Sequence, residues 1–161
     1  AEATYLYAKA CIGHGDTTNA VAMLTKAVGL KPDYAEAYLL RGETLLKAGE
    51  TAEADDDADR LLKDYPESED VLMLKARIER AKEQPDEAIL YYNKVIDANP
   101  FNAEAYRERG EMRTDTGDTD GGQDDLRHAA ELTVGQDGTA EGGDVASKVN
   151  EAYKNVNPLG I

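Results

Sequence analysis

The chain has 161 residues, of which 41% are hydrophobic, so it can form one ordinary domain or several stacked repeats and is not expected to be disordered throughout. Its 33 acidic residues against 18 basic ones give a formal net charge of −15, which opposes binding to the phosphate backbone of nucleic acid. No apolar run approaches the ~20 residues of a membrane-spanning helix, so insertion into a membrane is not expected. A soluble protein is therefore expected. The cytoplasm is one compartment compatible with this composition, and because the chain begins without Met, a processed or trimmed fragment that lacks its targeting segment is compatible as well.

The sequence repeats with a period of 34 residues. Residues 32–50 and residues 100–118 agree at nine of nineteen positions, and their offset is two such periods. Prolines and small residues recur at fixed places of the period, which predicts a stack of similar helix pairs. The recurring residues are Pro32, Pro66 and Pro100, with Val134 in the fourth place; Ala20, Ala54 and Ala88, with Gly122; and Gly15, Gly49 and Gly117, interrupted by Glu83.

Each period predicts two helices. In the second period, apolar residues recur at intervals of three and four from Ala37 to Leu46, and Gly49 can take the left-handed conformation that ends a helix. The small residues Gly42 and Ala54 are expected to let the two helices approach each other closely. Along the whole chain, the pattern predicts helices over residues 2–14, 16–30, 35–48, 51–64, 69–82, 85–98, 103–116 and 119–132.

The organisation changes beyond the fourth period. The segment from Thr133 to Asp144 is rich in glycine and acidic residues, which predicts a loop. Residues 145–156 then place apolar side chains at helical spacing, with Asp144 as a candidate N-cap and Pro158 beyond the end. We expect this helix to cover the last apolar face of the array; the alternative is that it docks onto another subunit. The predicted organisation is four repeats (residues 1–34, 35–68, 69–102 and 103–136), a loop (residues 137–143) and a capping helix (residues 144–157).

The period and its small residues resemble those of the tetratricopeptide repeat (TPR) family, whose 34-residue unit carries a W-x2-L-G-x2-Y, an A-x3-F and a P pattern. The Trp place holds Thr4, Tyr38, Leu72 and Tyr106, and the Leu-Gly place holds Tyr7-Ala8, Arg41-Gly42, Lys75-Ala76 and Arg109-Gly110. The resemblance covers residues 1–136. It implies an all-α fold, a right-handed superhelix (an α–α solenoid) of four helix–turn–helix repeats with a C-terminal capping helix. It also implies a scaffold that binds a peptide or a partner protein in a concave groove, without catalysis.

One stripe of each first helix is left free by the places that the TPR pattern uses for packing. Apolar side chains at one end of the array and arginines at the other would fit an extended peptide with an apolar segment and an acidic end. The alternative is that these arginines pair within the chain, with Glu104, Glu108 and Glu111. The Asn and Lys pattern of TPR domains that bind chaperone tails is missing from these stripes. The candidate groove residues are Tyr5, Lys9, Leu39, Leu46, Met73, Arg77, Arg80 and Arg107.

The residues give no reason to expect an enzyme, a metal site or a cofactor. His14 and His128 have no neighbouring Ser, Cys or second His at a catalytic spacing. Cys11, the only cysteine, cannot form an intramolecular disulfide and is expected to be a small buried thiol. Residues 116–121 (TGDTDG) resemble the start of a calcium loop, but Thr116 takes the place of the first ligand and Arg127 that of the bidentate Glu. A solvated acidic turn is expected there instead.

The sequence therefore predicts a non-enzymatic protein–protein interaction scaffold. Two alternatives stay open. The first is a structural self-association module, in which an apolar face joins identical copies into a homo-oligomer. The second is a regulatory TPR domain of a larger protein.

Overall fold

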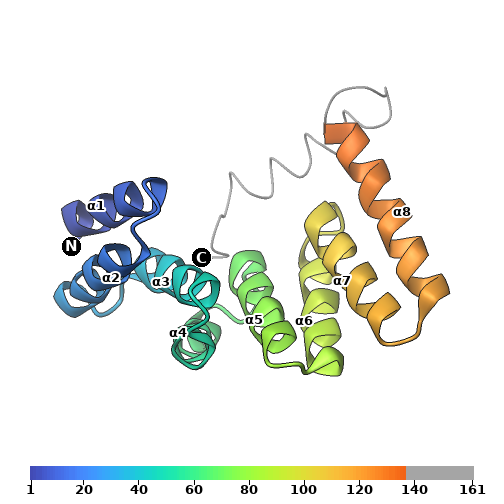
Figure 1. The fold of residues 1–161 in the computed structure, drawn as a ribbon, viewed down its shortest axis with the longest axis horizontal. Helices are drawn as coiled ribbons and strands as arrows, with labels where there is room; N and C mark the ends of the chain where they lie inside the picture. The colour runs from blue at the N-terminus through green and yellow to red at the C-terminus, as the bar shows by residue number, and fades with distance from the viewer. Residues whose placement is uncertain (137–161) are drawn as a thin grey trace. The chain divides into compact units, whose positions relative to one another are not determined.

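The structure is a computed structural model that describes residues 1–136. In this part of the chain there are eight α-helices and no strand, arranged as four consecutive hairpins (Figure 1). Each helix begins within one residue of the place that the 34-residue period predicts, so the all-helical hairpin fold is confirmed. The helices are α1 (Glu2–Gly13), α2 (Thr17–Leu30), α3 (Ala35–Lys47), α4 (Thr51–Asp64), α5 (Glu69–Ala81), α6 (Pro85–Ala98), α7 (Ala103–Asp115) and α8 (Thr119–Gln136).

Helices α1 to α4 form one compact unit, residues Ala1–Pro66. Within it, α1 packs on α2, α2 on α3, and α3 on α4. The core is built mostly from small side chains, which let the helices lie close together. Its buried members include Ala8, Leu24, Ala27, Val28, Tyr34 and Ala37, against which Tyr5, Met23, Tyr38 and Leu40 pack.

The second unit spans Glu67–Ile161, and the structure describes its residues 67–136. Here α5 packs on α6, α6 on α7, and α7 on α8. Tyr92, Val95 and Ala105 are each 0% exposed at the centre of the packing. Ser68 and Asn102 cap α5 and α7 with their side chains, and Pro85 stands in the first turn of α6, where its missing N–H does no harm.

The turn inside each hairpin places one residue in the left-handed conformation. Glycine takes this place in three hairpins, with φ of 77° at Gly15, 83° at Gly49 and 98° at Gly117. In the third hairpin the same place holds Glu83, with φ of 59°. A side chain with a Cβ is disfavoured there, so the third turn adopts the shared geometry at a cost in conformational energy.

The contact between α7 and α8 shows why the repeat needs small residues where its helices cross. A Cβ atom on Gly110 would lie 2.9 Å from the carbonyl oxygen of Gly122 and 3.0 Å from Cβ of Asp125. In the second hairpin the corresponding Gly42 is buried, and Ala54 is 0% exposed. Both observations fit the close helix contact expected at Gly42 and Ala54.

One prediction about secondary structure was wrong. Helix α8 runs to Gln136, four residues beyond its predicted end at residue 132, so residues 133–136 are helical and not part of a loop. The reason is Val134, which stands where Pro66 and Pro100 follow the ends of α4 and α6. Without a proline, α8 continues, and the Thr133 hydroxyl donates a hydrogen bond to the Ala129 carbonyl 2.9 Å away. The predicted loop (137–143) and capping helix (144–157) lie outside the described residues, and the repeat boundaries remain predictions.

Candidate functional site

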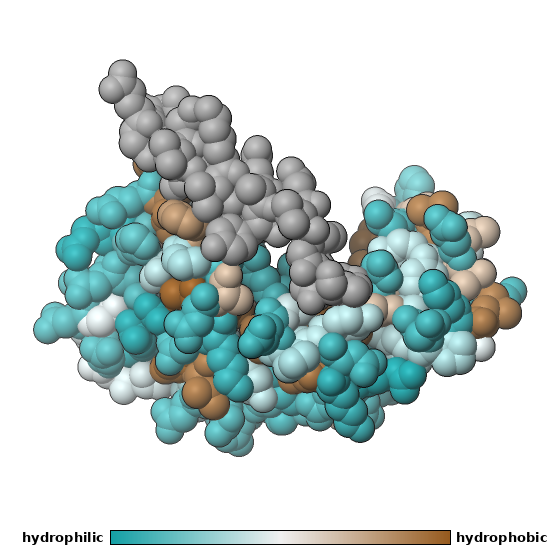
Figure 2. Space-filling model, turned by 180° about the vertical axis from the view of Figure 1, so that it is seen from behind, coloured by the Kyte–Doolittle hydropathy of each residue, from teal (hydrophilic) through white to brown (hydrophobic). Residues whose placement is uncertain are grey.

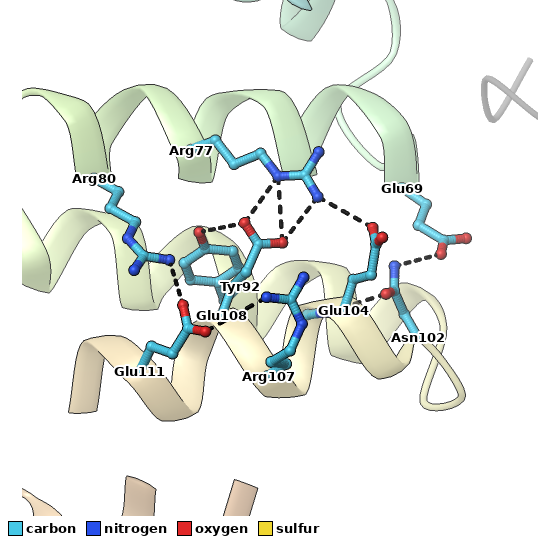
Figure 3. A network of polar contacts seen from close by, with 10 residues as sticks. Glu69, Arg77, Arg80, Tyr92, Asn102, Glu104, Arg107, Glu108 and Glu111 are labelled. Carbon is cyan, nitrogen blue, oxygen red and sulfur yellow. Dashed lines mark hydrogen bonds and ion pairs between the residues drawn. The ribbon is translucent and has the colours of Figure 1, made fainter. Parts of the chain in front are cut away.

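The first helices of the last two hairpins, α5 and α7, share a polar face (Figure 3). Arg77 on α5 is its centre. Its Nε atom donates to Oε1 of Glu108 at 2.9 Å, its Nη2 atom donates to Oε2 of Glu108 at 2.9 Å, and Nη2 also reaches Oε2 of Glu104 at 3.1 Å. Arg77 thus clamps Glu108 with two parallel hydrogen bonds, the strongest geometry available to an arginine–carboxylate pair.

Two further arginines extend this face. Arg80 Nη1 on α5 lies 2.9 Å from Oε2 of Glu111, and Arg107 Nη1 on α7 lies 3.4 Å from Oε1 of the same carboxylate. Because Glu111 belongs to α7, the Arg80 pair joins the two helices a second time. The stripe residues of successive first helices therefore lie side by side in this unit.

Glu108 is the buried member of the network. Its side chain is 9% exposed, and the Tyr92 hydroxyl donates to its Oε1 atom at 3.4 Å. Burial, together with the negative charge of Glu108, raises the pKa of Tyr92 above the ordinary value of a phenol. The hydrogen bond with Glu108 raises the pKa of Arg77, so this guanidinium keeps its charge.

The predicted arginine cluster is therefore neutralised within the chain. Arg77, Arg80 and Arg107 pair with Glu104, Glu108 and Glu111, the alternative that the sequence left open. The members differ in how accessible they are, since Arg107 is 51% exposed and Glu104 65%, whereas Met73 on the same stripe is 5% exposed.

The candidates of the first unit lie on α1 and α3. The ring of Tyr5 packs against the ring of Tyr34, with centroids 5.2 Å apart, and the Lys9 ammonium lies 5.7 Å above the Tyr5 ring. Burial raises the pKa of Tyr5, and the neighbouring Tyr34 phenol raises it further. Leu39 and Leu46 on α3 are half-buried. The candidates of this unit thus combine one aromatic and two aliphatic side chains with the exposed Lys9, and the charges of Glu36 and Glu43 also act on Tyr5.

Sequence comparison identifies the family of this chain. Two tetratricopeptide repeat models match it, one over residues 12–78 and the other over residues 73–122, and together they span more than half of the 161 residues. The chain belongs to the tetratricopeptide repeat family. TPR repeats typically serve as scaffolds for protein–protein interaction and not as catalysts, which is the general role that the sequence predicted.

Curated relatives and solved structures agree with this assignment. DnaJ homolog subfamily C member 3 is 30% identical in Mus musculus and 29% in Homo sapiens, over 81% of this chain. The chain spans only 29% of the length of these relatives. Among solved structures, MamA residues 41-end from Desulfovibrio magneticus RS-1 has a TM-score of 0.77 at 23% identity, covering 84% of this chain and 77% of MamA. A thermophilic TPR protein of Thermus thermophilus has a TM-score of 0.70 at 19% identity, covering 80% of this chain and 72% of its own. These structural likenesses show the fold.

Two further ion pairs were not predicted from the sequence. In both, the arginine stands at the place where the TPR pattern has its Leu. Arg41 Nε on α3 donates to Oδ2 of Asp57 on α4 at 2.8 Å, and Arg109 Nε on α7 donates to Oδ2 of Asp125 on α8 at the same 2.8 Å. Both carboxylates are buried, with side chains 4% and 6% exposed. The hydrogen bond with Asp57 raises the pKa of Arg41. The available signal was an Arg followed 16 residues later by an Asp in both the second and the fourth repeat.

The structure gives structural roles to several of the histidine, cysteine and acidic residues that were candidates for catalysis or metal binding. Asp118 accepts a hydrogen bond from the Gly121 N–H at 3.0 Å at the start of α8, as a helix cap does. His128 packs edge-on against Tyr106, with ring centroids 4.4 Å apart, and Cys11 is buried. Among residues 1–136, no group of three or more His, Cys, Asp or Glu side chains is placed to hold a metal ion. None of the described helices combines the length and the apolar character needed to span a bilayer.

Proposed function

We propose that the protein is a non-enzymatic interaction scaffold whose first helices bind an extended segment of a partner protein. The observation that carries the proposal is the side-by-side placement of α5 and α7, whose stripe residues form one polar face through the Arg77 and Arg80 pairs. Such a face presents several side chains along a line, which is the arrangement that an extended peptide needs.

The two units offer different contacts to a partner. On α1 and α3, Tyr5, Leu39 and Leu46 supply apolar surface, and Lys9 supplies a positive charge at its border. This combination accommodates a segment with apolar side chains and a nearby acidic group. Aromatic and aliphatic contacts of this kind provide affinity, whereas the charge orients the segment.

On α5 and α7, the residue best placed to meet a partner carboxylate is Arg107. It is 51% exposed, and its contact with Glu111 is long, at 3.4 Å. An exposed pair of this kind contributes about 0–1 kcal/mol, so Arg107 can exchange Glu111 for a partner carboxylate at little cost. Arg77 is held by Glu108 and Glu104 and Arg80 by Glu111, so we assign to both the role of shaping the face. Met73, at 5% exposed, adds little surface.

The test begins by identifying a partner through affinity capture and mass spectrometry, and by mapping its bound segment as a labelled synthetic peptide. The dissociation constant of that peptide is then compared between the wild type, Arg107→Glu and Lys9→Glu. Arg127→Glu is a matched control, because Arg127 is an exposed arginine of α8 that pairs with Asp124 and lies outside the candidate stripes. Binding should weaken in the first two variants and not in the control. It should also weaken with salt, because the Debye length falls to about 3 Å at 1 M.

Affinity that is the same in Arg107→Glu, Lys9→Glu and the wild type, with all proteins folded, would remove these charges from the mechanism. Loss of binding in Tyr5→Ser together with Leu39→Ser would then restrict the site to the apolar face of α1 and α3. If none of these variants changes the affinity, the first helices do not form the binding site.

A further inference from the structure

The outer face of α1 is the most apolar exposed surface of the first unit. Leu6 is 56% exposed and Tyr7 is 59% exposed, although most of the surface in Figure 2 is hydrophilic. Ala3 and Ala10 are exposed as well. These four residues are spaced by three, one and three, so they lie on one side of the helix. A helix that faces water with this side is expected to carry polar residues there.

The same places are covered to different degrees in α3 and α7. The place of Leu6 holds the half-buried Leu40 and the buried Glu108, the place of Tyr7 holds the half-buried Arg41 and Arg109, and the places of Ala3 and Ala10 are buried in both helices. In α3, 34 residues further on, Ala37 is 0% exposed and Thr44 is 6% exposed. In α7, 102 residues further on, Ala105 is 0% exposed and Met112 is 6% exposed. Ala3, Leu6, Tyr7 and Ala10 thus stand at places that are buried or half-buried in α3 and α7.

In both later cases the covering element is the second helix of the preceding hairpin. Helix α2 packs on α3, with Leu24, Ala27 and Val28 in one cluster with Ala37. Helix α6 packs on α7 in the same way, and Asn93 of α6 accepts a hydrogen bond from Arg109 of α7 at 2.9 Å. The outer face of α1 is therefore a continuation of an interface that this chain already forms twice.

We infer that the outer face of α1 docks the second helix of a further TPR repeat, placed ahead of α1 as α2 is placed ahead of α3. The docked helix would be amphipathic, with a small residue followed by larger apolar residues four and seven or eight positions later, as in Ala20, Leu24, Ala27 and Val28 of α2. This inference concerns a different surface from the peptide-binding stripes and does not depend on them.

A second copy of the chain is the less suitable occupant. Its helices α2 and α6 already pack against α3 and α7. Helix α8, which ends the described residues, has Ala130 where α2 has Val28 and so offers a smaller apolar side chain at that place. The relatives also leave room for further repeats, since this chain spans 29% of the length of DnaJ homolog subfamily C member 3.

The inference can be tested by joining an additional copy of residues 1–34 ahead of Ala1. The junction reproduces the step from Tyr34 to Ala35, so the added copy of α2 is in register to cover the inner α1, while the added copy of α1 becomes the new exposed helix. The pair of substitutions Leu6→Ser and Tyr7→Ser is then placed either in the inner copy or in the outer copy. The two proteins have the same composition and differ only in whether the substituted face is covered.

We expect the inner pair to lower the midpoint of thermal unfolding by several degrees and the outer pair to leave it unchanged, with far-UV circular dichroism confirming helix content. If the inner double variant does not melt cooperatively, Leu6→Ala in each copy gives the same comparison. Equal midpoints for the two positions would overturn the inference. Sedimentation of the 161-residue chain supplies a second measurement. A dimer that Leu6→Ser and Tyr7→Ser convert to a monomer would make a second copy the occupant and would also overturn it. A monomer in both cases supports it.

Discussion

Removing the Asp125 carboxylate should destabilise the protein more than any surface substitution. This carboxylate accepts hydrogen bonds from Arg109 at 2.8 and 2.7 Å and from Arg113 at 2.9 Å, and its side chain is 6% exposed. Asp125→Ala leaves the Arg109 guanidinium, whose side chain is 13% exposed, without a carboxylate. Breaking a buried pair from one side costs about 3–5 kcal/mol. Because Arg109 keeps its bond to Asn93, we expect the lower end, about 3 kcal/mol.

Substituting the arginine, alone and together with Asp125, shows how much of the loss in unfolding free energy comes from the Arg109–Asp125 pair itself. Arg109→Leu restores the residue of the TPR pattern and leaves Asp125 paired with Arg113, so the expected loss is about 1–2 kcal/mol. Combining Asp125→Ala with Arg109→Leu removes both members of the pair, so neither charge is left without its partner from the pair, and the expected loss is about 1 kcal/mol. The two single losses should therefore exceed the double loss by at least about 2 kcal/mol.

The assay is urea unfolding followed by circular dichroism, with the free energy of unfolding extrapolated to water. Asp124→Ala is the matched control. Asp124 pairs with Arg127 at 2.8 Å on the same helix, but the two side chains are 67% and 70% exposed. Its loss should stay within about 0.5 kcal/mol. If Asp125→Ala costs no more than Asp124→Ala, or if the single losses add up to the double loss, the buried pair does not stabilise the fourth repeat as argued.

Three further predictions concern packing, turn geometry and pH. Gly110→Ala should lower the free energy of unfolding by about 1–3 kcal/mol, because the added Cβ would lie 2.9 Å from the carbonyl oxygen of Gly122. Gly29→Ala, which has open space around it, should raise the free energy of unfolding by about 0.5–1 kcal/mol. Thermal melts of the two variants check both expectations. Glu83→Gly should raise the unfolding free energy by about 1 kcal/mol because φ is 59° there, and Gly117→Ala, at φ 98°, should lower it; shifts of the two urea midpoints in the same direction would contradict this. Finally, the raised pKa of Tyr92 means that the folded state holds its proton longer than the unfolded state, so stability is fully present below pH ~10 and is lost as the pH rises above it. Tyr92→Phe should lose less stability over that alkaline range, as measured by urea unfolding from about pH 9 to about pH 11.

The helices could be predicted from the sequence because their ends carry strong local signals. The glycines at residues 15, 49 and 117 and the prolines at residues 32, 66 and 100 mark the turns, and the apolar period supplies the rest. Even Glu83, which breaks the glycine pattern, takes the same turn geometry, because the packing of α5 on α6 holds it there. The end of α8 was missed because composition alone suggested a loop, whereas the absence of a proline at Val134 decided the outcome.

The sequence predicted that Arg77, Arg80 and Arg107 lie on one face, but it did not decide whether their charges are paired within the chain; that this face binds a partner stays a prediction. Spacing alone put Arg77, Arg80 and Arg107 on one face, since residues at equivalent places of successive repeats lie side by side. Whether these arginines face a partner or pair with Glu108 and Glu111 depends on side-chain reach between α5 and α7, and no sequence period encodes that distance. Their pairing neutralises the cluster, which is why we assign the attraction of an acidic segment to Arg107 and Lys9 in the proposed function.

The agreement between residues 32–50 and 100–118 has a physical cause in the Arg–Asp pairs. The guanidinium carbon of Arg41 lies 5.3 Å from the centroid of the Tyr38 ring, and that of Arg109 lies the same 5.3 Å from the centroid of the Tyr106 ring. A charged side chain at the Leu place needs a carboxylate partner, since an isolated buried charge is costly, and in the third repeat Lys75 finds it on its own helix, in Glu79 at 3.3 Å. Repeats one and three hold Tyr7 and Lys75 there and carry no Asp 16 residues later. Because the second and fourth hairpins lie in different compact units and reach the same geometry, the arrangement is set within the hairpin and the helix preceding it. The Tyr and the Arg that the two segments share therefore make the same contacts in both hairpins.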